Sequence, residues 1–294
     1  MIMPEHIATP ARTNEILRRH GFRLKKSLGQ NFLTNPKILA NIVAAGEVSQ
    51  DDDVIEIGPG IGALTEFLAE SAHQVLALEI DARLLPVLAE TLAPYDNVAV
   101  VEADVLKADL ATLIADHFDG QHRIKVVANL PYYITTPILM HLIDTPIDFA
   151  SITVMMQKEV AARLTAQLNS KDYGSLSIGV QQNMDVAVAF TVSRTAFVPA
   201  PNVDSAIVTL RRREKPLVTV SDQAAFDRLV RGSFVARRKT LWNNLTNLFG
   251  KDEATKAKLT AALAAVSVLP SARAEQLSIA QFAALTDALA EAGF

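Results

Sequence analysis

Three observations predict an α/β fold with a mostly parallel sheet, followed by a small all-α domain. Between residues 53 and 157, short apolar runs rich in β-branched residues alternate with helical patterns, as expected for strands buried on both faces. A glycine-rich loop follows the first of these runs. From Ser221 onward, every periodic segment has helical spacing. Strands that alternate with helices in this way pair in parallel.

The elements of the predicted sheet domain can be placed in order. A helix comes first, in "NPKILANIVAAG", with Asn35 as its cap, Pro36 in its first turn and Gly46 at its end. Amphipathic segments such as "ALTEFLAES" and "ARLLPVLAETL" separate the strands, and Pro86 interrupts the second of these near its start. The predicted strands are residues 53–57, 74–80, 97–103, 124–129 and 151–156.

The pattern changes after Ala162. Residues 173–184 have helical spacing, and two later runs, 186–192 and 203–210, have strand character and flank a proline-rich loop. Four further helices are predicted, at residues 222–234, 239–249, 252–266 and 278–292. We therefore expect three parts: a basic N-terminal extension (1–24), a domain with the sheet (25–213) and a helical domain (214–294).

Composition excludes several kinds of chemistry. The 294 residues contain no cysteine, which removes disulfides, thiolate metal sites and cysteine nucleophiles. The six histidines form no HExxH motif or close pair, so no metal is expected. No apolar run is long enough to span a bilayer, and the N-terminus lacks the apolar region of a signal peptide. We expect a cytoplasmic protein without a membrane contact.

Positive charge is concentrated in two segments, although the formal net charge is −4. Residues 12–26 and 228–239 are both strongly basic, and an uneven charge distribution steers binding more than the total does. Either segment alone is also compatible with an ordinary solvated helix face. The candidate nucleic-acid-contacting residues in the second segment are Arg228, Arg231, Arg237, Arg238 and Lys239.

The loop "EIGPGIGALT" follows the first strand and opens a helix. Glycines at 58, 60 and 62 allow the backbone to approach a ligand closely, which indicates a nucleotide-type cofactor. The loop does not say which cofactor. Gly58, Gly60 and Ala63 also satisfy the dinucleotide fingerprint, and Glu79 follows at about the distance that this fingerprint expects.

Polar side chains stand at the ends of three successive strands. Glu79 can accept hydrogen bonds from both hydroxyls of a ribose, and Asp104 can accept one from an adenine amino group. Asn129 ends the next strand. Because open α/β sheets bind ligands at the carboxyl ends of their strands, we expect these residues to share a site with the glycine loop. A single acid at such a position can also be a helix cap.

The segment Asn129, Leu130, Pro131 and Tyr132 fits a purine amine as nucleophile. The lone pair of such an amine is delocalised into the ring, and two acceptors aimed at its N–H bonds favour the attacking, pyramidal form. The Asn129 side-chain oxygen and the Leu130 carbonyl, held in front of Pro131, are candidate acceptors. Tyr132 can stack on the base. Taken alone, the segment is also compatible with a turn that ends a strand.

The methyl donor that fits this chemistry is S-adenosylmethionine. Its sulfonium is its own leaving group, so neither a metal nor a strong base is needed. A dinucleotide enzyme has no use for an amide, a carbonyl and a ring around an amine. The target base must leave its stack to enter such a pocket, which indicates a flipped or unpaired nucleotide.

These motifs resemble one family. "KKSLGQNFL" (25–33), "EIGPGIGALT", "ALEID", "EADVLKAD", "NLPYYI" and "FVPAPNVDSA" (197–206) are together similar to the bacterial 16S ribosomal RNA adenine N6,N6-dimethyltransferases. The resemblance covers about residues 25–250. It implies a Rossmann-like class I methyltransferase domain with a helical C-terminal domain. It also implies dimethylation of two adjacent adenosines in the hairpin loop near the 3′ end of 16S rRNA, during biogenesis of the small ribosomal subunit, by a monomer.

The resemblance also implies roles for individual residues. Asn129 would sit between the cofactor and the target amine, and Phe197 would help to sandwich the target base, although Phe197 is also compatible with an apolar plug. Residues 1–11 have no counterpart. The implied S-adenosylmethionine contacts are Asn31, Leu33, Gly58, Glu79, Asp104 and Asn129.

Three alternatives remain. A 23S rRNA adenine dimethyltransferase of the macrolide-resistance type shares the chemistry of "NLPY", but "FVPAPNVDSA" and "RRKTLWNNL" favour the 16S enzyme. The basic segments disfavour a protein glutamine methyltransferase. A non-catalytic RNA-binding assembly factor would not need an intact set of cofactor residues.

Overall fold

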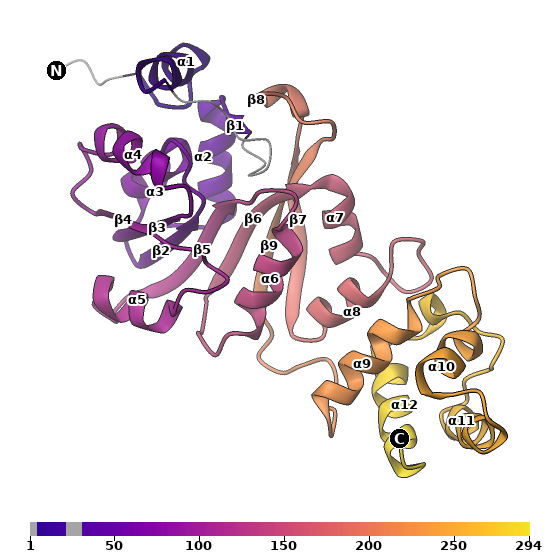
Figure 1. The fold of residues 1–294 in the computed structure, drawn as a ribbon. Helices are drawn as coiled ribbons and strands as arrows, with labels where there is room; N and C mark the ends of the chain where they lie inside the picture. The colour runs from indigo at the N-terminus through magenta and orange to yellow at the C-terminus, as the bar shows by residue number, and fades with distance from the viewer. Residues whose placement is uncertain (1–4, 22–30) are drawn as a thin grey trace. The chain divides into compact units, whose positions relative to one another are not determined.

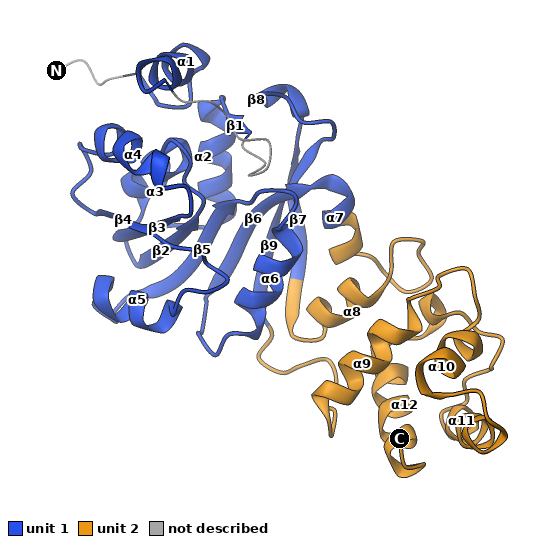
Figure 2. Ribbon diagram, in the orientation of Figure 1, with its two compact units in different colours: residues 1–161, 186–212 blue, residues 162–185, 213–294 orange. Residues whose placement is uncertain are grey.

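The computed structural model describes residues 5–21 and 31–294 (Figure 1). These residues form two compact units, one of residues up to 161 together with 186–212, and the other of residues 162–185 and 213–294 (Figure 2). The first part of the "KKSLGQNFL" motif, residues 25–30, lies outside the described residues. No helix in the described ranges combines the length and apolar character needed to cross a bilayer.

A seven-stranded sheet forms the centre of the first unit, in the order β4-β3-β2-β5-β6-β9-β7. The pairs from β4 through β6 are parallel, whereas β6 and β9 are antiparallel. This confirms the predicted mostly parallel sheet. The strands are β2 (Asp52–Ile57), β3 (Gln74–Glu79), β4 (Val98–Glu102), β5 (Arg123–Asn129), β6 (Ser151–Gln157), β7 (Met184–Val192) and β9 (Ser205–Arg212).

Most of the strands of this sheet are connected by helices. Asn35 caps the first as predicted, because its side-chain oxygen accepts the N–H groups of Lys37 and Ile38. The segment around Pro86 is a short 3-10 turn, Ala82–Leu84, followed by a helix with the proline in its first turn, where the missing N–H does no harm. The helices are α2 (Pro36–Ala45), α3 (Ala63–Ser71), α4 (Leu85–Thr91), α5 (Leu110–His117), α6 (Thr135–Asp144) and α7 (Lys158–Leu164).

The N-terminal helix α1 (Pro10–Arg19) packs on this unit. Its Ile16 is buried in the same apolar cluster as Phe67 of α3. Glu66 of α3 accepts the backbone N–H of Ile7 at 3.1 Å, and Glu90 of α4 pairs with Arg19 and lies 2.9 Å from the His20 ring. The described part of the basic N-terminal extension is therefore a docked helix, with some of its charge already paired.

The second unit is helical and has its own apolar core. Phe226 and Phe282 are completely buried in it, and the Tyr173 hydroxyl donates to the Leu277 carbonyl at 3.2 Å. The structure thus groups residues 162–185 with the C-terminal helices, whereas the sequence suggested one boundary near residue 213; the functional division into domains stays a prediction. The helices are α8 (Ser175–Gln181), α9 (Gln223–Ser233), α10 (Leu241–Phe249), α11 (Glu253–Ala265) and α12 (Ile279–Glu291).

Candidate active site

A pocket opens at the carboxyl ends of four neighbouring parallel strands, β4, β3, β2 and β5. This is the edge at which open α/β sheets bind their ligands. The pocket brings together candidate residues at successive strand ends with the two N-terminal residues, Asn31 and Leu33, that the resemblance implied. They are Asn31, Leu33, Gly58, Glu79, Asp104, Asn129, Leu130, Pro131 and Tyr132.

The glycine loop forms the floor between β2 and α3. Gly58, Gly60 and Gly62 have φ angles of +71°, +63° and +89°, a region that side chains other than glycine rarely adopt. A Cβ at Gly60 would lie 3.0 Å from the ring of Phe32. The loop therefore needs its glycines both for the turn itself and for close packing against β1 (Phe32–Leu33).

Glu79 connects this loop to the end of β3. One carboxylate oxygen accepts the N–H of Gly60 at 3.2 Å, and the other accepts the N–H of Asp81 at 2.9 Å. Burial raises the pKa of Glu79, and the two backbone donors oppose that rise. Because each carboxylate oxygen can accept more than one hydrogen bond, the group can still receive two hydroxyls of a ribose.

Asp104 lies just beyond β4 in a more open position. Its carboxylate accepts the N–H of Leu106 at 3.1 Å and lies 3.2 Å from the Lys107 ammonium. About a quarter of its side chain is exposed, against 83 % for Lys107, so this ion pair is weak and screened by solvent. Asp104 can therefore turn an oxygen toward a ligand at little cost.

Asn129 ends β5, and the turn after it is rigid. The Pro131 carbonyl accepts the N–H of Ile134 at 3.2 Å and the hydroxyl of Thr135 at 2.9 Å. Leu130 is 1 % exposed, so the turn is packed from within. Within residues 5–21 and 31–294, the side-chain amide of Asn129 forms no hydrogen bond to the protein, which leaves both ends of the amide for a ligand.

The two tyrosines of this turn differ in their surroundings. The Tyr132 hydroxyl and the Ser205 hydroxyl of β9 are 2.6 Å apart and share a hydrogen bond. Burial raises the pKa of Tyr132, so the phenol stays neutral near pH 7. Tyr133 also lines the pocket, but 57 % of it is exposed. The first ring is thus held in place and the second is open to solvent.

Phe197 does not line this pocket. Its side chain is 3 % exposed, and it lies in β8 (Phe197–Val198), which pairs with β1 so that Phe197 faces Leu33. Leu33 does reach the pocket, and so does Asn31. The contact of Phe197 with a target base stays a prediction, and in this structure the ring belongs to the apolar core.

Glu56 is a pocket residue that the sequence did not single out. It lies inside β2, is 1 % exposed, and one of its carboxylate oxygens lacks a hydrogen-bond partner. Burial raises its pKa to about 8, and the charge of nearby Glu79 adds to the rise. A glutamate between the apolar residues Ile55 and Ile57 of β2 was the available signal, because an unpaired buried carboxylate is costly unless it serves a ligand.

The candidate RNA-contacting residues lie on the second unit and are exposed. Some already have protein partners: the Arg228 guanidinium lies over the ring of Phe249, and Arg231 pairs with Asp227 at 3.4 Å. Arg237 donates to the carbonyls of Lys171 and Tyr173 at 2.9 and 2.7 Å. Arg237 therefore holds a loop of its own unit as well as carrying charge.

Comparison with known proteins identifies the family. The family described as ribosomal RNA adenine dimethylase matches residues 21–291. The chain belongs to the ribosomal RNA adenine dimethylase family. Members of this family use S-adenosylmethionine as the methyl donor.

Curated relatives cover almost the whole chain. The ribosomal RNA small subunit methyltransferase A of Latilactobacillus sakei is 63 % identical over 98 % of this dimethylase and 97 % of its own length. The protein of the same name from Ligilactobacillus salivarius is 59 % identical, over 99 % and 98 %.

Two solved structures are similar to this adenine dimethylase. A dimethyladenosine transferase from Plasmodium falciparum matches with a TM-score of 0.71 and 28 % identity, covering 88 % of this chain and 98 % of its own. The 23S rRNA methyltransferase ErmE matches with a TM-score of 0.62 and 30 % identity, covering 88 % and 99 %.

Proposed function

We propose that this enzyme dimethylates N6 of two adjacent adenosines in the hairpin loop near the 3′ end of 16S rRNA, within the small ribosomal subunit or its precursor. The near full-length identity of about 60 % to small subunit methyltransferases supports this substrate. The observation that carries the proposal is the convergence of the glycine loop, Glu79, Asp104 and the Asn129–Tyr132 turn on one pocket.

The residues of the pocket fit S-adenosylmethionine, which supplies a methyl group on a positively charged sulfur. Glu79 suits the ribose hydroxyls and Asp104 the adenine amino group. Glu56, with its unpartnered oxygen, suits the ammonium of the methionine part, which must pass the Gly58 backbone. Asn31 and Leu33 close the pocket from the N-terminal side.

Asn129 and Leu130 act on the target amine. In the proposed role, the Asn129 side-chain oxygen and the Leu130 carbonyl accept the two N–H bonds of N6, which turns the nitrogen lone pair out of the ring toward the methyl carbon. A bound S-adenosylmethionine would supply the methyl group to N6, its sulfur would leave as a neutral thioether, and the excess N6 proton would pass to solvent water. Fixed acceptors of this kind are most effective where charge develops.

Tyr132 would hold the target base by stacking. Its hydrogen bond to Ser205 fixes the plane of the ring, so the base meets a surface that is already oriented. Stacking on Tyr132 offsets part of the stacking free energy that an adenosine loses when it flips out of the RNA.

The remaining parts of the proposal concern the partner and the cell. Exposed Arg238 and Lys239 on the second unit would contact phosphates of the ribosomal particle. A ribosomal substrate would be met in the bacterial cytoplasm. All the proposed cofactor residues come from one copy of the chain, which supports action as a monomer.

A 23S rRNA adenine dimethyltransferase is the second candidate, favoured by the match to ErmE. Its identity of 30 % is about half that to the small subunit enzymes. The same pocket would serve either reaction, so the RNA that is methylated decides between the two candidate functions.

Methyl transfer to separated particles tests the proposal. Purified enzyme and tritium-labelled S-adenosylmethionine would be incubated with small subunits that lack the modification and, in parallel, with large subunits. We expect label only in the small subunit, as N6,N6-dimethyladenosine, with primer extension stopping at two adjacent residues. Label in the large subunit would establish the second candidate, and no label in either particle would indicate a non-catalytic role.

Asn129→Ala tests the proposed chemistry. We expect the rate under saturating substrates to fall by about 10²- to 10³-fold, with unchanged folding and little change in RNA binding. Asn97→Ala in the same unit, whose amide donates only to backbone carbonyls, controls for general loss of an amide. A single-turnover rate near that of the parent enzyme would rule out the role given to Asn129.

A further inference from the structure

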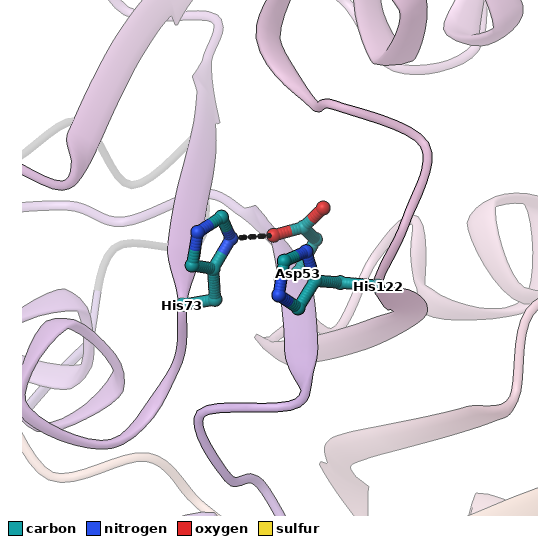
Figure 3. A group of neighbouring side chains, drawn as sticks. All are labelled: Asp53, His73 and His122. Carbon is teal, nitrogen blue, oxygen red and sulfur yellow. Dashed lines mark hydrogen bonds and ion pairs between the residues drawn. The ribbon is translucent and has the colours of Figure 1, made fainter.

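Two histidines and an aspartate meet at the edge of the sheet opposite the cofactor pocket (Figure 3). Asp53 is the second residue of β2, His73 immediately precedes β3, and His122 immediately precedes β5. Since β3 and β5 flank β2 on its two sides, three residues that are distant in the sequence are brought together. One ligand atom from each lies within 4.8 Å of the others.

The contacts within this group are well defined. The His73 Nδ1 lies 2.9 Å from one carboxylate oxygen of Asp53, and the rings of His73 and His122 stack with centroids 3.7 Å apart. The His122 Nδ1 lies 3.1 Å from Asp119. The contact with Asp119 orients the His122 ring, as neighbouring carboxylates orient metal-binding histidines.

Asp53 gives independent reason to expect a cation. Its side chain is fully buried, and its second carboxylate oxygen has no hydrogen-bond partner. The neighbouring buried acid, Asp52, is instead paired with Lys125 and Arg123. A buried carboxylate with an unused oxygen is costly, and a bound cation would remove this cost.

We propose that Asp53, His73 and His122 bind a divalent transition-metal ion of the zinc type at the amino-terminal edge of the sheet. Two imidazoles with one carboxylate suit zinc, nickel or copper, whereas magnesium and calcium prefer oxygen ligands alone. The acidic side chains of Asp51 and Asp119, close enough to act on the charge of His122, add attraction for a cation.

The stacked arrangement defines the change that binding requires. Ring-nitrogen lone pairs lie in the ring plane, so two nearly parallel rings cannot both point at one ion. Ligand atoms around a tetrahedral zinc are about 3.4 Å apart, for bonds of about 2.1 Å. One ring must therefore rotate and close in by up to about 1.4 Å, the difference between 4.8 and 3.4 Å. The side chains of His73 and His122 are 33 % and 24 % exposed, which leaves room for this movement, while Asp53 stays fixed.

The ion would connect the starts of three adjacent strands. Because the cofactor pocket lies at the other end of these strands, binding is expected to stabilise the first unit without contacting the reacting groups.

Metal titration of untagged, chelator-treated enzyme tests the proposal. We expect one Zn²⁺ per chain by calorimetry, visible absorption bands with Co²⁺, a higher Tm with Zn²⁺, and none of these effects with Mg²⁺. His122→Gln is expected to weaken Zn²⁺ binding at least about tenfold, whereas His117→Gln, on α5 and outside the group, should leave it unchanged. S-adenosylmethionine affinity reports that both variants are folded.

Two results would overturn the proposal. One is a parent enzyme that binds no Zn²⁺ under these conditions. The other is a His122→Gln variant that binds Zn²⁺ as tightly as the parent, which would place the ion elsewhere; Asp53→Asn then provides a second check on the same site.

Discussion

At the scale of single residues, the Glu79 carboxylate joins two functions. It holds the glycine loop through the N–H of Gly60, and it is proposed to receive the ribose of the cofactor. Asp104, in contrast, contacts only its own loop and Lys107. Glu79 therefore helps to hold the glycine loop of the pocket in place, whereas Asp104 does not.

Glu79→Ala and Asp104→Ala are both expected to weaken S-adenosylmethionine binding. Loss of one hydrogen bond to a charged group corresponds to roughly 1.5 to 3 kcal/mol, or about ten- to 150-fold in affinity. Only Glu79→Ala should also lower the Tm, because it releases the Gly60 loop. Calorimetry measures the affinity, with exposed Glu102→Ala as the control. Equal affinities in all four proteins would remove the cofactor assignment.

Glu56 makes the stability of the cofactor-free enzyme depend on pH. Its pKa is about 8 in the folded protein, above its ordinary value of 4.5, so the folded state holds a proton that the unfolded state has released between these values. Glu56 therefore does not lower the free energy of unfolding below about pH 4.5, where it is protonated in both states. The free energy of unfolding falls as pH rises from there to about 8.

Glu56→Gln keeps the shape of the neutral carboxyl and cannot ionise. The variant should match the parent near pH 5 and be more stable than the parent near pH 8.5, as measured by urea unfolding at both values. If the difference in unfolding free energy is the same at the two pH values, Glu56 is not the titrating group.

At the scale of elements, the turn between α9 and α10 carries three of the five proposed RNA-contacting residues. Arg237 in this turn also holds two carbonyls of residues 171–173, so replacing it would disturb the fold of the second unit. Arg238 and Lys239 are exposed and are the better test of phosphate contact.

Reversal of Arg238 and Lys239 to Glu should weaken binding to small subunits and reduce its salt dependence. Each lost phosphate contact lowers the slope of log affinity against log salt by about 0.7 to 0.9. Filter binding at several salt concentrations measures this slope. Reversal of Lys251 and Lys256 provides a control with the same charge change. If the two double variants have equal slopes of log affinity against log salt, the turn makes no specific phosphate contacts.

Several elements could be predicted from the sequence because their signals are local. The apolar runs that became β2, β3 and β5 lie in the middle of the sheet, and Asn35 and Pro36 mark the start of α2. The pairing of β1 with β8 could not be predicted. Each is two residues long, and two residues have no periodicity.

At the scale of the whole molecule, the features that the sequence did not predict depend on contacts between distant segments. The gathering of the candidate cofactor residues in one pocket was predictable because successive βα units place their strand ends at one edge. The burial of Phe197 follows from its pairing with Leu33, and the group of His73 and His122 follows from the order of β3, β2 and β5. Residues 162–185 join the second unit through contacts such as Tyr173 with Leu277.

The docking of α1 has a consequence for how the protein is handled in solution. Helix α1 covers apolar side chains of the first unit, and the His6 ring stacks on Phe67. A chain that begins at residue 21 would uncover this surface and leave Glu66 without the Ile7 N–H. Exposed apolar patches promote self-association, so the shortened protein should scatter more light at high concentration and unfold at a lower temperature. A shortened protein that stays monomeric with unchanged Tm would mean that α1 is dispensable for solubility.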